Sequence, residues 1–171
     1  LRFLRAKKYS NANAFKMLET FLIRSQMFPQ WFQRVSIFDD ERINELYSSG
    51  YIFPLPERDS NGARVIFVQA SKLNTAKFAF TDILKILNFV IFTLLEEEET
   101  QIAGFVYILD QKDISMDYIL LFSLFDVKNY LECVQSAIPA RQKRAVWLNL
   151  PAFAVKLAEF MKSLVSTGLE L

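Results

Sequence analysis

The segment Gly104-Phe105-Val106-Tyr107-Ile108-Leu109-Asp110 decides the fold that this sequence predicts. It completes an apolar run that begins at Ile102, and Asp110 closes that run. A continuous apolar run, in place of an alternation of apolar and polar residues, is typical of a central strand that is buried on both faces. We therefore expect Ile102–Leu109 to be the central strand of a sheet.

Strands and helices alternate on both sides of this segment. Strands are expected at Arg64–Ala70 and Ala145–Leu150, which are rich in β-branched and aromatic residues. The alternation predicts an α/β fold with a mostly parallel sheet, flanked by helices that make right-handed crossovers. Helices are expected at about 10–26, 39–49, from Thr81 or Asp82 to Glu97, from Asp117 or Asp126 to Ala137, and at 153–165.

The remaining stretches set the domain organisation. The first two helices form a small N-terminal helical lobe, residues 1–50, ahead of an α/β domain at 51–171. Residues 51–62 are expected to be a turn-rich connection, with a turn at Asn61-Gly62.

The apolar residues of three expected helices indicate which sides of these helices are buried. In the first helix, Phe15, Leu18 and Leu22 have the spacing of a buried stripe. The helix at 82–97 is apolar nearly all round, so every face of it must be covered. The sheet can cover one side, and either more protein or a ligand must cover the other. The last helix is expected to bury one face made of Phe153, Leu157, Phe160 and Leu164.

Composition excludes several kinds of chemistry. The 171 residues contain no histidine, which excludes histidine-based acid–base catalysis and histidine-ligated metals. Four glycines cannot form a dinucleotide-binding or phosphate-binding loop at the required spacing. The single cysteine, Cys133, lies in an apolar helix without a neighbouring base and is expected to be structural. We expect no enzyme, no cofactor and no metal.

Phenylalanine is unusually frequent, and the charged residues are unevenly distributed along the chain. The 17 phenylalanines indicate either an aromatic core or a surface that faces an apolar ligand. The net charge of +1 gives no global field for nucleic acid. Cations nevertheless gather at residues 1–8 and 141–144. Four consecutive glutamates at 96–99 are expected to form a solvated helix end.

Four motifs occur in a fixed order along the chain. They are Arg2-Phe3-Leu4-Arg5-Ala6-Lys7-Lys8-Tyr9, Asp59–Val65, Gly104–Asp110, and the Pro139, Arg141, Asn149 and Pro151 set. In this order and at this spacing they resemble the CRAL-TRIO family, and within it the α-tocopherol transfer and retinaldehyde-binding proteins. Asp113 stands where the family usually has glycine, and Asp tolerates a left-handed turn better than most residues.

The resemblance implies a helical lobe, a sheet floor and helical walls around a pocket that holds a lipophilic molecule. Polar groups such as Tyr107, Tyr130 or Gln135 would select among lipids. By resemblance, the pocket is lined by Leu84, Leu87, Ile91, Phe105, Tyr107, Leu109, Phe122, Tyr130, Cys133, Val134 and Ile138.

The resemblance also implies a basic cleft for phosphoinositide head groups, made of Arg5, Lys7, Arg141 and Lys143. Gly168 stands where that cleft has a further lysine. Cationic side chains there would form charge-assisted hydrogen bonds to phosphates. A solvated cationic face is the alternative interpretation of the same four residues.

The resulting hypothesis is a monomeric cytoplasmic carrier that attaches peripherally to anionic membranes. It would transfer tocopherol, a retinoid or a phosphoinositide-type lipid between them. The alternative is a membrane- or protein-docking module that senses lipid without transferring it. We expect the chain to be a fragment that lacks the start of the helical lobe and the family's C-terminal gate helix.

Overall fold

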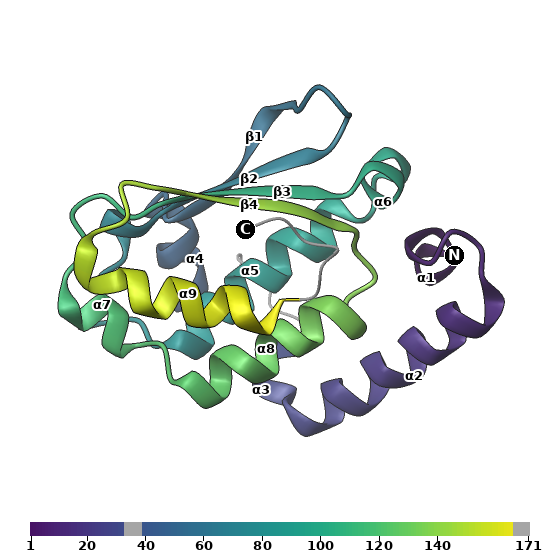
Figure 1. Ribbon diagram of the computed structural model, residues 1–171, viewed down its shortest axis with the longest axis horizontal. Coiled ribbons are helices and arrows are strands. Elements are labelled where there is room, and N and C mark those ends of the chain that lie inside the picture. The colour runs from purple at the N-terminus through teal and green to yellow at the C-terminus, as the bar shows by residue number, and fades with distance from the viewer. Residues whose placement is uncertain (33–38, 166–171) are drawn as a thin grey trace.

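A mixed sheet with helices on one side organises the molecule (Figure 1). The computed structural model describes residues 1–32 and 39–165. Within them the strand order is β1-β2-β3-β4, where β2, β3 and β4 are parallel and β1 pairs antiparallel at the edge. The strands are β1 (Ile52–Arg58), β2 (Arg64–Gln69), β3 (Phe105–Asp110) and β4 (Gln142–Leu148).

The helices connect these strands and extend N-terminal to them. The arm formed by α1 and α2 lies beside the end of the sheet near α6 (Figure 1). The bounds are α1 (Arg2–Ala6), α2 (Asn11–Met27), α3 (Pro29–Phe32), α4 (Glu41–Ser48), α5 (Phe80–Leu94), α6 (Glu98–Ala103), α7 (Met116–Leu120), α8 (Leu124–Ser136) and α9 (Val155–Leu164), with single turns at Ala70–Lys72 and Ala152–Ala154.

The inner position of β3 and the mostly parallel sheet are confirmed. The expected burial of β3 on both faces is wrong, because only Phe105 and Val106 are buried and helices cover one side of the sheet (Figure 1).

The expected connection at 51–62 is also wrong. Residues Ile52–Arg58 form strand β1, although this strand contains Pro54 and Pro56. Proline cannot donate to a ladder and is therefore confined to edge strands and irregular positions. Here β1 is the edge strand, and its register shifts between Pro54 and Arg58. The expected turn at Gly62 is present, with φ of +79°.

The glutamate run is solvated as expected at Glu96, Glu98 and Glu99, but it does not lie at the C-terminal end of the long apolar helix. Helix α5 ends at Leu94, and a separate helix α6 begins at Glu98. Two of the acids thus occupy the first turn of α6, where the helix dipole stabilises negative charge. Glu97 accepts hydrogen bonds from Arg58 and Arg64, and the bond from Arg64 contributes most to lowering the pKa of this carboxyl.

Gly104 separates α6 from β3, so the expected strand begins three residues too early. Its φ of +87° lies in the left-handed region, where glycine is favoured. A Cβ at this position would stand 2.3 Å from the carbonyl oxygen of Arg141. The same carbonyl accepts the Phe105 backbone N–H at 2.9 Å, which begins the pairing of β3 with β4.

The predicted buried stripe of α2 is wrong. Phe15 and Leu22 are 69% and 53% exposed, whereas Ala14 and Met17 are each 4% exposed. Both stripes have helical spacing and lie on adjacent faces of one helix, so the spacing alone could not choose between them. Phe21 continues the inward face and packs edge-on against Phe3, Phe32 and Phe92.

The predicted face of the last helix is correct only in part. Phe153 belongs to the 3-10 turn before α9 and is 46% exposed, so it does not share the helix face. Leu157, Phe160 and Leu164 lie within α9 and are partly buried. Gly168, singled out by the sequence, lies outside the described residues.

One hydrophobic core joins the N-terminal helices to the sheet. Trp31, Ile43 and Leu46 are almost completely buried and belong to the same cluster as Ile86 and Phe105. Helices α3 and α4 cover the side of α5 that faces away from the sheet, and the division at residue 50 stays a prediction. The apolar helix is therefore covered by protein on one side, and the cavity described below lies against the other.

Two motif residues meet at the opposite end of β3 from Gly104. The Asn149 side-chain amide donates to Asp110 at 2.8 Å, and this bond is the main cause that lowers the pKa of the Asp110 carboxyl. Asp113, two residues beyond Gln111, has φ of +58°, so the expected left-handed turn is present.

The substitution Gly104→Ala tests the close approach at the α6–β3 junction. We expect the free energy of unfolding to fall by about 3 kcal/mol or more, because the methyl group would collide with backbone and the residue would be strained.

Gly50→Ala is the matched control, since Gly50 also has positive φ (+75°) but has no atom within 4 Å of the position that a Cβ would take. It should cost only about 1 kcal/mol. Urea midpoints measure both, and equal losses would contradict the steric account.

Candidate ligand-binding site

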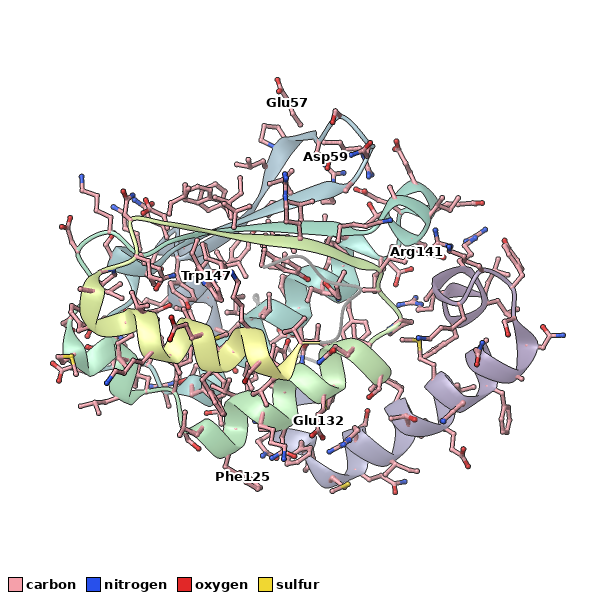
Figure 2. The ribbon with its side chains drawn as sticks, in the orientation of Figure 1. Glu57, Asp59, Phe125, Glu132, Arg141 and Trp147 are labelled. Carbon is pink, nitrogen blue, oxygen red and sulfur yellow. The ribbon has the colours of Figure 1, made fainter. Side chains whose placement is uncertain are left out.

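An apolar cavity lies between the inner face of the sheet and the helices beneath it. Its volume is about 210 Å³, and it is partly open to solvent. Successive side chains of a strand point to opposite faces, so every second residue of β3 and β4 faces this space. Tyr107 and Leu109 come from β3, and Ala145 and Trp147 come from β4. Figure 2 shows Trp147 between β4 and α9.

Most of the predicted pocket residues line this cavity. The other three, Phe105, Cys133 and Ile138, are completely buried in the core and lie outside the cavity lining. Burial raises the pKa of the Cys133 thiol to about 11, which fits the expected structural role. The predicted residues that line the cavity are Leu84, Leu87, Ile91, Tyr107, Leu109, Phe122, Tyr130 and Val134.

Sequence reasoning missed the lining from β1, α7, α9 and the start of β4. Tyr51 and Ile52 fell in the stretch interpreted as a connection, because its prolines hid the strand. Gln142 was missed because the third strand was expected to begin at Ala145. The residues missed also include Val68, Gln111, Tyr118, Ala145, Trp147, Leu157, Ala158 and Met161.

The polar side chains around the cavity are neutral and arranged in three groups. The Tyr107 hydroxyl donates to Gln142 Oε1 at 2.8 Å, near the start of β3. The hydroxyls of Tyr51 and Tyr118 are 3.3 Å apart, near the far end of that strand. Burial raises the pKa of each of these three phenols, so all of them are protonated at neutral pH.

The third group is a structural bridge. Tyr130 donates to the Asn88 side chain at 2.8 Å, and Asn88 donates to the Trp31 carbonyl at 2.7 Å. This chain links α8, α5 and α3 and satisfies a buried amide. Gln135, expected to be a selectivity group, instead donates to the carbonyls of Leu131 and Leu164, both at 3.1 Å.

The described lining contains no Asp, Glu, Lys, Arg or His. Among residues 1–32 and 39–165 there is also no cluster of three potential metal ligands. A concave apolar surface with a few convergent polar groups is the usual form of a small-molecule binding site. The arrangement can therefore desolvate an apolar molecule and orient it by neutral hydrogen bonds.

The four predicted head-group residues divide into two pairs. Arg5 forms an ion pair with Glu98 at 2.7 Å and donates to Gln101 at 2.8 Å. Arg141 donates to the carbonyl of Ile102 at 2.6 Å and to that of Arg5 at 2.5 Å. Figure 2 shows Arg141 just before the start of β4, beside α1. These two arginines join α1 to α6 and β4.

The two lysines are different. Lys7 is half-buried and Lys143 is exposed. Within the part of the chain that the structure describes, neither ammonium group has a hydrogen bond or ion pair. Lys143 is the residue at which β4 bulges, because Gln142 pairs with Phe105 and Arg144 pairs with the adjacent Val106.

Comparison with known proteins identifies the family of this fold. A family model for the CRAL/TRIO domain matches residues 48–170. The chain belongs to this family, whose members bind lipophilic ligands and transfer them.

Two curated relatives illustrate the similarity. Clavesin-1 from Rattus norvegicus is 29% identical over 162 residues, which are 95% of this chain and 46% of that protein. Alpha-tocopherol transfer protein-like from Homo sapiens is 25% identical over 151 residues, which are 88% of this chain and 43% of that protein. The chain thus spans less than half the length of either relative.

A solved structure shares the fold. The crystal structure of Sfh5 superposes with a TM-score of 0.56 at 14% identity, covering 98% of this chain and 61% of that one. In the described part of the chain, every helix is too short or too polar to cross a membrane.

Proposed function

We propose that this chain binds a small lipophilic molecule in the cavity and transfers it between membranes. The observation that carries the proposal is the uncharged, largely apolar lining, assembled from all four strands and from α5, α7, α8 and α9. Burying about 200 Å² of apolar ligand surface would contribute about 5 kcal/mol. A lipid can therefore be held without covalent chemistry.

The volume indicates how the cavity would accommodate a lipid. At about 210 Å³ it is smaller than the roughly 300–1,000 Å³ of typical ligand pockets. A tocopherol, a retinoid or a lipid chain would therefore have to widen it. Ile119, Phe122 and Leu131, on or beside α7 and α8, are only partly buried, so they can move outward without breaking the fully buried core.

The alternative function is that of a lipid sensor, which binds its ligand but does not transfer it. Both proposals require a filled cavity, and transfer from donor to acceptor vesicles separates them. The carrier moves lipid between vesicles, whereas the sensor binds lipid and leaves its distribution unchanged. We place either protein in the cytoplasm, as a monomer with peripheral attachment to membranes, with residues 1–50 as its helical lobe.

Val134→Trp tests whether the cavity is the binding site. The larger side chain would fill part of the lining, so we expect binding of tocopherol or retinol to fall about tenfold or more. The control is Ser136→Trp, on the exposed side of the same helix. It should leave binding within about twofold. Intrinsic fluorescence titration measures both, and circular dichroism checks that both variants fold. Equal affinity in both variants would contradict the assignment.

We further infer that Lys7 and Lys143 bind phosphoinositide head groups, while Arg5 and Arg141 hold α1 in place. The support is that both arginines already have partners, whereas the two lysines have none within the described residues. Arg5, for example, would have to give up its ion pair with Glu98 to bind phosphate. Free ammonium groups have no such cost. Each basic residue near an anionic surface is worth about 1 kcal/mol.

The double variant Lys7→Glu/Lys143→Glu should weaken binding to vesicles that contain phosphatidylinositol bisphosphate by about tenfold or more. The urea midpoint should stay unchanged, because neither lysine has a partner to lose. Lys16→Glu/Lys128→Glu, two exposed positions on α2 and α8, makes the same change in net charge. Vesicle co-sedimentation at fixed ionic strength compares the two. An equal loss in both would show attraction by net charge alone.

A further inference from the structure

We propose that Gln142 binds a hydroxyl group of an uncharged lipid inside the cavity, and that Tyr107 positions its amide. This inference rests on the proposed function and deepens it, because it names the chemical class of the ligand and a residue that selects it.

The strand register places the two side chains together. Gln142 is the first residue of β4 and pairs with Phe105, two residues before Tyr107 on the neighbouring strand. Both Gln142 and Tyr107 line the cavity. The Tyr107 hydroxyl donates to Gln142 Oε1 at 2.8 Å, so it fixes one end of the amide.

The other end of the amide has no partner. Gln142 Nε2 has less than 1 Å² of exposed surface and makes no hydrogen bond within the described residues. Native proteins leave few buried polar atoms unpaired, because each one loses its hydrogen bonds to water without replacement. An oxygen on a bound ligand would restore the missing bond.

The contracted cavity explains why this nitrogen is covered. A ligand larger than the present 210 Å³ must move the surrounding apolar side chains outward as it enters. Gln142 belongs to a strand that is paired with β3, so its backbone stays in place while the helices move. The amide is then the fixed polar group that a ligand meets at this end of the sheet.

A hydroxyl is the group that fits best. If the oxygen and nitrogen of the Gln142 amide exchange places, the Tyr107 hydroxyl accepts from Nε2. The unpaired atom is then Oε1, which needs a hydrogen-bond donor. A hydroxyl both donates and accepts, so it satisfies either arrangement, whereas an ether or a carbonyl satisfies only one.

The absence of charge from the described lining argues against ionised lipids at this position. A carboxylate or phosphate in an apolar cavity is unfavourable unless a cation pairs with it. Arg141 is adjacent to Gln142 in sequence, but its guanidinium is held outside the cavity by the carbonyls of Ile102 and Arg5. The neutral Tyr107–Gln142 pair is the polar group available at this end.

The test compares two probes that differ by one hydroxyl. All-trans-retinol and axerophthene, its counterpart without the hydroxyl, share one chromophore and can be titrated by fluorescence with the full chain. We expect the ratio of retinol affinity to axerophthene affinity to fall about tenfold in Gln142→Leu, which corresponds to about 1.4 kcal/mol. Axerophthene affinity should be retained, which shows that the cavity is intact.

A second variant separates positioning from folding. Gln142→Leu leaves the Tyr107 hydroxyl without its acceptor, which could destabilise the fold. The double variant Gln142→Leu/Tyr107→Phe removes both polar groups, so no buried hydroxyl is left unpaired. It should show the same lowered ratio, and Tyr107→Phe alone should lower the ratio by less. Hexadecan-1-ol and hexadecane, used as competitors of a fluorescent lipid, repeat the comparison with a chain of different shape.

The outcomes separate the inference from the proposed function. An unchanged alcohol-to-hydrocarbon ratio in Gln142→Leu, with both members still bound, overturns the role of Gln142 and leaves lipid binding standing. Tighter binding of palmitate than of hexadecan-1-ol also overturns it. If neither pair binds to the wild-type chain, the hydroxyl-lipid assignment is wrong, and failure to bind any lipid overturns the proposed function as well.

Discussion

The close approach of the Arg141 backbone to Gly104 is the constraint on which the rest of the structure depends. Only glycine fits at the junction of α6 and β3. A Cβ atom at residue 104 would stand 2.3 Å from the carbonyl oxygen of Arg141, which directly precedes β4. The hydrogen bond from Phe105 to that carbonyl starts the β3–β4 pairing, and the bulge at Lys143 then places Ala145 and Trp147 on the face toward the helices. The Arg141 side chain then ties α1 to the same junction.

The cavity follows from this register and from one helix that is apolar on every face. Helix α5 buries one side against α3 and α4, and its Leu84, Leu87 and Ile91 turn toward the sheet. On the sheet, Tyr107 and Trp147 face the same space. Apolar surface therefore remains around a space that protein does not fill, which is where a lipophilic molecule gains most from burial.

Much of this arrangement could be predicted from the sequence where one pattern had one interpretation. The unbroken run that ends at Asp110 indicated the central strand, and the apolar α5 indicated that its second side needed a cover. Prediction failed where two solutions satisfied the same pattern. Two stripes of α2 had helical spacing, and only tertiary packing chose Ala14 and Met17 over Phe15 and Leu18. The edge position of β1, which makes its prolines acceptable, is a property of the sheet and not of the segment. The pairing of Arg5 with Glu98 joins residues that are distant in sequence, and no local signal revealed it.

Lipid extraction combined with native mass spectrometry, on protein purified from cells without added lipid, tests whether the folded protein carries a lipid in its cavity. We expect a near-stoichiometric, uncharged, hydroxyl-bearing lipid that leaves the protein when it is denatured. The folded protein should retain this lipid through gel filtration. A folded, monodisperse protein that carries no lipid and takes none up from mixed vesicles would contradict the account.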